Sequence, residues 1–186
     1  MSPSVYLHIA KSAIGEHFGH TKIDSDALVE SYPDLAAEKA CFVTLTIDHR
    51  LRGCIGSIIP HRPLIDDLIY NAISAAFKDP RFPPLGSDEF ARVSIEVSLL
   101  TIPQNVTYTD RNDLKTLIRP HIDGVILRLG NQQATFLPQV WEELSDFDLF
   151  FAHLGLKAGI GSDPLSYHPQ IYTYQVEKFE EHSDEQ

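Results

Sequence analysis

The sequence has little cysteine and no long apolar run. Only two of its 186 residues are cysteines, Cys41 and Cys54. No apolar stretch approaches the ~20 consecutive residues that a membrane-spanning helix needs. The first residues lack the basic and then apolar order of a secretory signal. We therefore expect no membrane span, and a cytoplasmic protein whose two thiols do not form a structural disulfide.

Basic residues are also few. Lys and Arg number 15 against 26 Asp and Glu, which gives a formal net charge of −11. A chain so acidic is repelled by phosphate backbones over long range, and it contains no run of basic residues, so binding to nucleic acid is disfavoured. Hydrophobic residues make up 43% of the chain and charged residues 22%, which is typical of a folded globular protein.

The order of the hydrophobic patterns predicts a mixed fold. Apolar residues at helical spacing predict helices, and alternating apolar residues predict strands. Because the strands come mainly as hairpins with helices inserted between them, we expect an α+β fold with a mainly antiparallel sheet flanked by helices. We expect one domain over residues 1–179, with a smaller subdomain inside it, and an acidic tail over residues 180–186. The predicted helices are 2–18, a turn at 34–39, 63–77, 112–119, 138–144 and 146–157, and the predicted strands are 41–47, 51–58, 92–101, 124–129, 133–137 and 170–179.

The stretch Leu51-Arg52-Gly53-Cys54-Ile55-Gly56 is the strongest candidate for a functional site. Two glycines bracket Cys54, and Arg52 precedes it by two residues. A nearby guanidinium lowers the pKa of a thiol, and glycines in a strand leave the backbone open to another group. Free cysteine also acts as a small buried hydrophobe in many proteins. The residues alone leave both interpretations of Cys54 open.

The length of the preceding turn decides where Cys54 points, because a slip of one residue reverses every side chain of a strand. A three-residue turn at 48–50 sets Leu45 opposite Gly53 and completes one apolar face. Arg52 and Cys54 then share the other, polar face, and Cys41 points to the opposite face of the hairpin from Cys54, which prevents a disulfide between them within the hairpin. A two-residue turn instead mixes Arg52 and Cys54 with apolar residues, so the pattern favours the three-residue turn.

Other residues offer weaker candidates. Arg81 and Phe82 lie in a proline-rich loop, where the arginine either binds a carboxylate or phosphate group or braces the loop through Asp79. Glu96 is a base near Cys54 if their strands are neighbours, and otherwise a solvated residue. His17 and His20 have a spacing at which two histidines could bind a metal, but no third ligand lies near them in sequence. No segment has the pattern of a phosphate-binding loop, so we predict no metal and no cofactor.

Several blocks together resemble one protein family. From about Phe42 to Phe179 the chain is similar to the AmmeMemoRadiSam system protein A family, also called the AMMECR domain. Two positions differ from the family pattern: His49 stands where relatives usually have glycine, and Gly155 where many have cysteine. The blocks that carry the resemblance are 51–56, 71–85, 95–101, 123–127, 135–143 and 157–159.

The resemblance implies an α+β fold and partner proteins, but no activity. The family has no established biochemistry, and its six-residue signature is a suspected binding or catalytic site. Relatives accompany a Memo-like protein and a radical S-adenosylmethionine protein. We favour a partner-binding module over a thiol-dependent enzyme or modification acceptor, because no base or metal set is evident beside Cys54. A small-molecule ligand also stays open. The expected binding residues are Leu51, Gly53, Ile55, Gly56, Arg81 and Phe82, and the catalytic candidates are Cys54, as the nucleophile, and Arg52, which would stabilise its thiolate.

Overall fold

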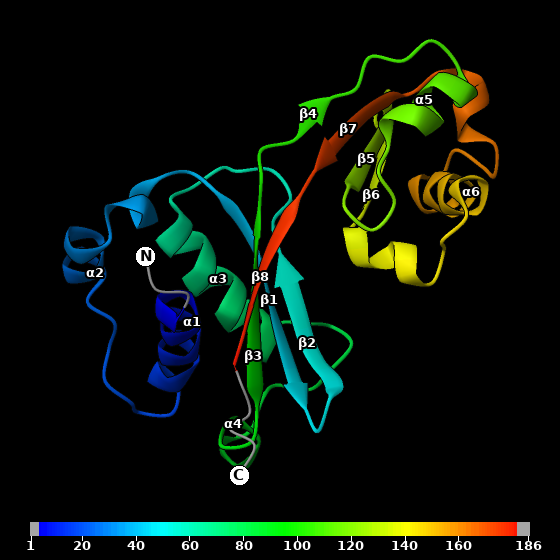
Figure 1. Ribbon diagram of the computed structural model, residues 1–186. Coiled ribbons are helices and arrows are strands. Elements are labelled where there is room, and N and C mark those ends of the chain that lie inside the picture. The colour runs from blue at the N-terminus through cyan, green and yellow to red at the C-terminus, as the bar shows by residue number, and fades with distance from the viewer. Residues whose placement is uncertain (1–3, 182–186) are drawn as a thin grey trace. The chain divides into compact units, whose positions relative to one another are not determined.

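A computed structural model describes residues 4–181 and confirms the α+β fold (Figure 1). The chain forms two compact units, and the first is discontinuous: it contains the residues up to Leu100 and those from Glu177 onward. The second unit is Thr101–Val176. Each unit contains one four-stranded sheet, with the strand orders β2-β1-β3-β8 and β4-β7-β5-β6. The pairings between β1, β2 and β3, and those of β5 with β6 and β7, are antiparallel.

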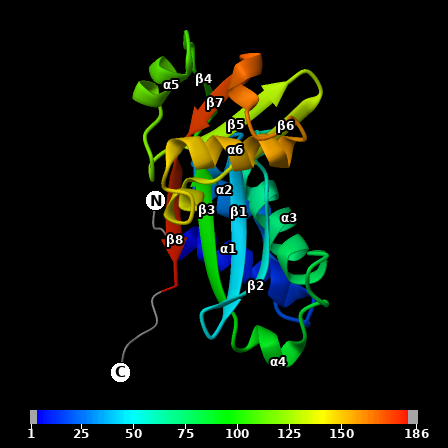
Figure 2. The same ribbon diagram turned by 90° about the vertical axis from the view of Figure 1, so that its right-hand side faces the viewer.

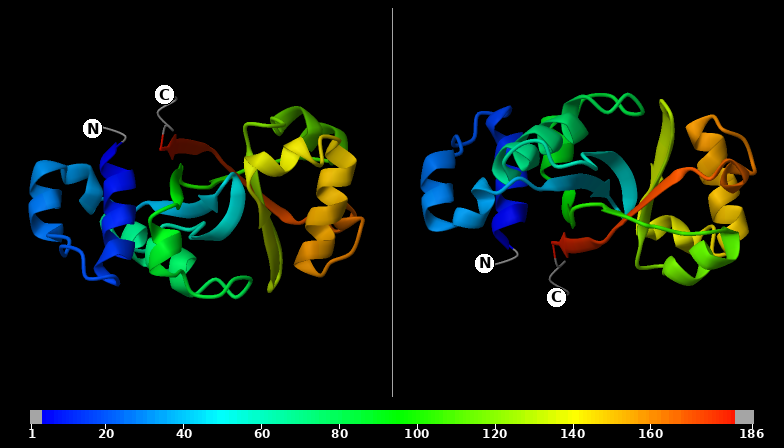
Figure 3. Two further views of the ribbon diagram at one scale, coloured as in Figure 1. Left: turned by 90° about the horizontal axis from the view of Figure 1, so that it is seen from below. Right: turned by 90° about the horizontal axis from the view of Figure 1, so that it is seen from above.

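In the first unit, two helices cover one face of the sheet. The helices α1 and α3 pack against each other and against the strands, while α2 lies on the outer side of α1 (Figures 1 and 3). Apolar residues of α1, α3 and the inner sheet face form one core, in which Ile9, Leu45 and Leu68 are fully buried. The elements are α1 Ser4–Glu16, α2 Ser25–Ser31, the 3-10 turn η1 Pro33–Ala36, β1 Ala40–Ile47, β2 Arg50–Gly56, α3 Leu64–Phe77, α4 Ser87–Phe90, β3 Ser94–Leu100 and β8 Val176–Glu180.

In the second unit, α6 packs on β5 and β6 (Figure 2). Its core centres on Trp141, whose ring stacks on Phe150 with 3.6 Å between ring centroids. Gly159 ends α6 in the left-handed conformation, which glycine adopts without strain. The elements are β4 Gln104–Asn105, α5 Arg111–Leu117, β5 Gly124–Leu129, β6 Gln132–Phe136, the 3-10 turn η2 Pro138–Glu142, α6 Phe147–Ala158, the 3-10 turn η3 Pro164–Tyr167 and β7 Gln170–Tyr174.

The turn between β1 and β2 is shorter than predicted. Asp48 and His49 form a two-residue turn with positive φ angles of 51° and 63°, and Ile47 pairs with Arg50. A tight hairpin turn needs the left-handed region at both positions, which aspartate and histidine tolerate better than most residues. The predicted three-residue turn is therefore wrong, although His49 adopts the conformation that glycine adopts most easily.

A β-bulge restores the predicted pairing around Cys54. The register shifts at Arg52, which has no partner on β1. Beyond the bulge, Leu45 lies opposite Gly53 and Thr44 opposite Cys54, as the sequence predicted. The extra residue of the bulge compensates for the residue that the turn lacks.

Three further predictions of secondary structure need correction. The strand predicted over 170–179 is two strands, β7 and β8, which belong to different sheets. The helix predicted over 138–144 is a 3-10 turn. The helix α2 was not predicted, because it has no fully buried residue and so shows no apolar stripe. The first two residues of the helix predicted over 2–18 and most of the predicted acidic tail lie outside the described residues. Within residues 4–181, no helix has the length and apolarity to span a bilayer.

Candidate functional site

The glycines of the signature allow close packing by the protein itself. A Cβ atom on Gly53 would lie 2.1 Å from the carbonyl oxygen of Ala75 in α3. A Cβ atom on Gly56 would lie 2.2 Å from the ring of Phe42 on β1. The space left by the two missing side chains is therefore filled by a helix backbone and an aromatic ring. Gly53 lets β2 approach α3, and Gly56 lets Phe42 lie over the strand.

Arg52 clamps β2 to the segment that follows α3. Its Nε donates to Glu89 Oε2 at 2.6 Å, and its Nη2 donates to Glu89 Oε1 at 3.1 Å and to the Pro83 carbonyl at 2.7 Å. The guanidinium also lies 5.7 Å from the ring centre of Phe82. Hydrogen bonds from Arg52 hold the pKa of Glu89 below its ordinary value. The arginine is 8% exposed, so it acts as a buried anchor for the loop.

A second clamp joins the loop to the backbone of Cys54. The Cys54 N–H donates to Asp79 Oδ2 at 3.0 Å, and Arg81 Nη2 donates to the Cys54 carbonyl at 3.4 Å. Arg81 also donates to Asp79 through Nε at 3.0 Å and Nη2 at 2.7 Å. Hydrogen bonds from Arg81, and then from the Cys54 N–H, hold the pKa of the buried Asp79 carboxyl well below its usual range. The sequence had left a loop brace and an anion-binding arginine open, and the brace is present.

This second clamp occupies the free edge of the sheet. β2 is the edge strand of its sheet, so the outward N–H and C=O of Cys54 have no neighbouring strand to bond. Asp79 supplies an acceptor and Arg81 a donor, as a neighbouring strand would. Covered edges resist pairing with other chains. The loop therefore protects the edge strand at Cys54.

The thiol of Cys54 is not activated by Arg52. Burial is the largest effect on this thiol and raises its pKa, while the hydrogen bond between the Thr44 hydroxyl and Cys54 Sγ at 3.3 Å and the charge of Arg81 lower it by less. The net shift is upward, so the thiol is protonated at neutral pH. Arg52 itself is held by Glu89 and the Pro83 carbonyl, and the cation whose charge acts on the thiol is Arg81.

Glu96 lies on the far side of β1 from Cys54. The strand order places β1 between their strands, and Thr44 pairs with Cys54 on one side and with Glu96 on the other. Two strand spacings separate their Cα atoms by about 10 Å. Burial is the main cause that raises the pKa of the Cys54 thiol, and the charge of Glu96 adds to it. Burial raises the pKa of Glu96, and Lys178 Nζ lies 3.4 Å from its Oε1. Glu96 forms an ion pair with Lys178 on the sheet face.

The other predicted site residues form two groups, one exposed to solvent and one packed inside the first unit. Leu51 is 44% exposed, and the Arg81 side chain is 54% exposed. Phe82 is half-buried, and Ile55 packs against the core of the first unit. The structure thus leaves Leu51 and the Arg81 loop accessible, and uses Arg52, Gly53 and Ile55 for packing.

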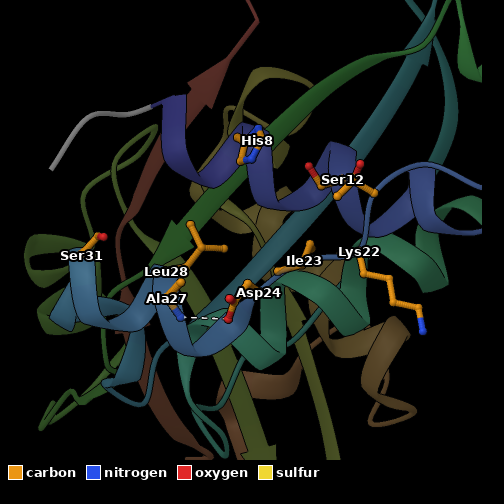
Figure 4. A pocket seen from close by; sticks show the side chains of 9 residues that line it. His8, Ser12, Lys22, Ile23, Asp24, Ala27, Leu28 and Ser31 are labelled. Carbon is orange, nitrogen blue, oxygen red and sulfur yellow. Dashed lines mark hydrogen bonds between the residues drawn. The ribbon is translucent and has the colours of Figure 1, made fainter.

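A separate hollow of about 320 Å³ lies between α1 and α2 (Figure 4). The side chains of His8 and Ser12 come from α1, and Lys22 points away from the hollow (Figure 4). No residue of the signature or of the proline-rich loop lines it. Among residues 4–181, no three His, Cys, Asp or Glu side chains are grouped so that they would hold a metal ion.

Sequence reasoning missed Glu89, the main partner of Arg52. The two residues are separated by 37 positions, and the predicted elements do not place α4 beside β2. The only local signal was the pattern Gly86-Ser87-Asp88-Glu89, in which Glu89 accepts a hydrogen bond from the Gly86 N–H at 3.2 Å, as in a capping box. That pattern predicts a helix start, but not a partner for Arg52.

Comparison with known proteins gives one consistent result. The family model AMMECR1 matches residues 7–179. A protein of Methanothermobacter thermautotrophicus is 40% identical over 94% of this chain and 92% of its own length, and a protein of Methanocaldococcus jannaschii is 40% identical over 94% and 88%. The crystal structure of an uncharacterised protein, PH0010 from Pyrococcus horikoshii, superposes with a TM-score of 0.82 at 33% identity, over 95% of this chain and 90% of that one.

The departure at Gly155 has a structural reason. A Cβ atom there would lie 2.3 Å from the carbonyl oxygen of Gly161 and 2.7 Å from Pro164. A cysteine would not fit without a shift of the backbone of this segment. The observed conformation therefore has no room at position 155 for a cysteine that would act together with Cys54.

Proposed function

The chain belongs to the AMMECR1 family, and we propose that it is a binding module that docks a partner protein. The docking surface consists of Leu51 on β2 together with Arg81, Phe82, Pro83 and Pro84 of the loop. The other signature residues support this surface without being part of it. Arg52 binds the Pro83 carbonyl of the loop, and Gly53 lets β2 pack on α3. The proposal accounts for a signature in which only Leu51 is exposed.

One observation carries the proposal: the tip of the loop is exposed while its base is fixed. Arg81, Pro83 and Pro84 are exposed, whereas Asp79 and Arg52 are buried and paired. A loop that is already ordered loses little conformational entropy when it binds, so more of the contact energy appears as affinity. An exposed arginine beside prolines and an aromatic ring is also a composition enriched at interface cores.

The partners that we propose are those that the family resemblance implies, a Memo-like protein and a radical S-adenosylmethionine protein. A small molecule is the alternative ligand of the same surface. Burial raises the pKa of Cys54, and β1 separates its strand from that of Glu96, and both observations support a docking role over a catalytic one.

Substitution on the docking surface tests this function. We expect Leu51→Asp and Pro84→Asp each to weaken binding to the partner protein by roughly tenfold or more relative to the parent chain. In the complex, a buried charge would replace an apolar contact at the interface. Leu149→Asp is the matched control, since Leu149 is 53% exposed on α6 and lies outside the surface. Binding to purified Memo-like and radical S-adenosylmethionine proteins is measured by calorimetry. The proposal fails if neither protein binds the parent chain, or if all variants bind alike.

A second function, thiol chemistry at Cys54, has one observation in its favour. The thiol is only partly buried, and Thr44 and Arg81 both lower its pKa. An acceptor or nucleophile of this kind requires a reactive thiol near neutral pH.

Alkylation of Cys54 as a function of pH decides between the two functions. Because burial raises the pKa of Cys54, we expect its alkylation rate to rise only at pH values above those of an ordinary thiol, which titrates near ~8.5. Arg81→Gln removes a cation that lowers this pKa and should move the curve to still higher pH. The fully buried Cys41 serves as the internal control and should not react in the folded protein. A rate that reaches its plateau below pH 7 would instead establish an activated thiol.

A further inference from the structure

The helix α6 carries apolar side chains on two opposite faces. One face packs on β5, β6 and η3 through the buried residues Phe147, Phe150, Phe151, Leu154, Gly155 and Ala158. Leu149 and Leu156 lie on the other face, and they are 53% and 57% exposed. An ordinary surface helix is polar on the side that faces water. A helix with leucine on its outer face as well has the pattern of an element that packs between two layers.

The two exposed leucines lie at the centre of the outer face of α6. At ~100° per residue, seven positions bring Leu156 to within about 20° of Leu149 around the helix axis. The half-buried Ala152 and the exposed His153 lie on either side of this pair. The outer face therefore has an apolar centre with more polar surroundings, which is the composition of an interface core and its rim.

The leucines are placed symmetrically about the middle of the helix. Leu149 and Leu156 lie equally far from the midpoint between Ala152 and His153. A surface that meets a second copy of itself across a twofold axis must be self-complementary. When two α6 helices run antiparallel about an axis at this midpoint, Leu149 of each copy lies at the height of Leu156 of the other. Each exposed leucine then meets an apolar side chain, so the outer face of α6 is complementary to itself.

Charge favours the antiparallel arrangement. The exposed Asp146 caps the start of α6, and the exposed Lys157 lies in its last turn. Eleven positions bring these two side chains to the same edge of the outer face, within about 20° of each other. In the antiparallel pair, Lys157 of each copy therefore lies near Asp146 of the other, whereas a parallel pair would place like charges together. Lys157 Nζ donates to the Thr135 carbonyl at 2.9 Å, and an ammonium group has further donors for a carboxylate.

We propose that α6 is the interface of a symmetric dimer, in which the α6 helices of two copies of this chain pack antiparallel. Leu149 of each copy contacts Leu156 of the other, and Lys157 pairs with Asp146 at both ends. Two helices of this length bury less than the ~1,200 Å² of a standard interface, so the dimer is weak and depends on concentration. The interface shares no residue with the proposed docking surface. A monomeric chain therefore keeps that surface, and the two proposals fail separately.

Sedimentation equilibrium at increasing protein concentration tests the dimer. Between about 10 µM and about 1 mM, the range of weak association, we expect the average mass of the parent chain to rise from one copy toward two. Leu156→Asp places a charge at the centre of the interface and should weaken association by roughly tenfold or more. Ile122→Asp is the matched control, because Ile122 is 50% exposed in the same unit and lies outside α6. A parent chain that stays monomeric, or Leu156→Asp and Ile122→Asp variants that associate alike, overturns the proposal.

Disulfide trapping tests the antiparallel register separately. Leu149→Cys and Leu156→Cys variants are oxidised with glutathione disulfide, alone and as an equal mixture, and covalent dimers are measured on non-reducing gels. In the antiparallel pair, positions 149 and 156 of different copies lie side by side, while like positions lie about 10 Å apart along the helix axis, which is too far for a disulfide. The mixture should therefore form covalent dimers severalfold faster than either variant alone, and the parent chain controls for reaction of the half-buried Cys54. Cross-linking that is as fast within one variant as in the mixture overturns the proposal.

Discussion

Gly53→Ala is expected to destabilise the protein by about 3 kcal/mol or more, as overpacking against a rigid element does. The added Cβ would lie 2.1 Å from the carbonyl oxygen of Ala75 and 3.0 Å from its carbonyl carbon. Both atoms belong to the backbone of α3, so the clash is relieved only if the whole helix or strand moves. The free energy of unfolding, measured by urea titration at pH 7, should show this loss as a lower midpoint.

Gly86→Ala is the matched control for this substitution. Gly86 precedes α4, and a Cβ atom there would meet nothing closer than Glu89 Oε1 at 3.8 Å. Its φ of −88° suits alanine, so we expect a change of at most a few tenths of a kcal/mol, or about 1 kcal/mol if capping is weakened. Equal midpoints for Gly53→Ala and the parent would show that β2 does not pack on α3 as described. If a Gly53 variant loses partner binding, the cause is therefore disturbed packing of β2 on α3 rather than a lost contact between Gly53 and the partner.

Asp79→Asn is expected to cost about 2–3 kcal/mol at pH 7, because it weakens charge-assisted hydrogen bonds to a buried group. The carboxylate accepts bonds from the Cys54 N–H and from the N–H, Nε and Nη2 of Arg81. An asparagine oxygen replaces only part of this set, and its NH2 group faces donors rather than acceptors. The loop should then detach more readily from the edge strand.

The same substitution should change the dependence of stability on pH. The folded pKa of Asp79 is depressed, so the folded state binds fewer protons than the unfolded state, in which aspartate titrates near ~3.9. The stabilisation is complete above that value and is lost as the pH falls through the lower folded pKa. Below about pH 4, the parent should lose stability more steeply than Asp79→Asn.

Asp26→Asn separates this effect from the general loss of carboxylate charge. Asp26 is exposed on α2, and its substitution should leave the acid limb of the stability curve almost unchanged. Urea titrations between pH 2 and pH 7 provide the comparison. Acid limbs of equal slope for the parent and Asp79→Asn would contradict the assigned role of Asp79.

The faces of the hairpin were predictable because they depend on hydrophobic alternation. Leu45 and Gly53 face α3, and Cys54 faces away with Thr44, as the pattern indicated. The turn length was wrong because a β-bulge has no signal in this pattern. Two residues in the turn and one extra residue in the strand give the same faces as three residues in the turn, so the prediction for Cys54 was correct although its premise was not.

The partners of the signature residues were less predictable, because they come from distant parts of the chain. Asp79 and Arg81 are two positions apart, and their brace was among the alternatives read from the sequence. Arg52 instead pairs with Glu89 across 37 positions, and Asp67 binds the backbone of Cys41 across 26. Alternation and helical spacing give the face of a residue, but not the element that covers it.

The discontinuity of the first unit bears on how the protein folds during its synthesis. β8 lies beside β3 in the first sheet, but the whole of the second unit is translated between them. At ~5–20 residues per second, β3 waits about 4–15 s on the ribosome with one edge unpaired. During that interval the nascent sheet is open to strands of other chains. The second unit, which is continuous in sequence, needs no such delay, so the later part of the chain is able to fold before the earlier part is complete.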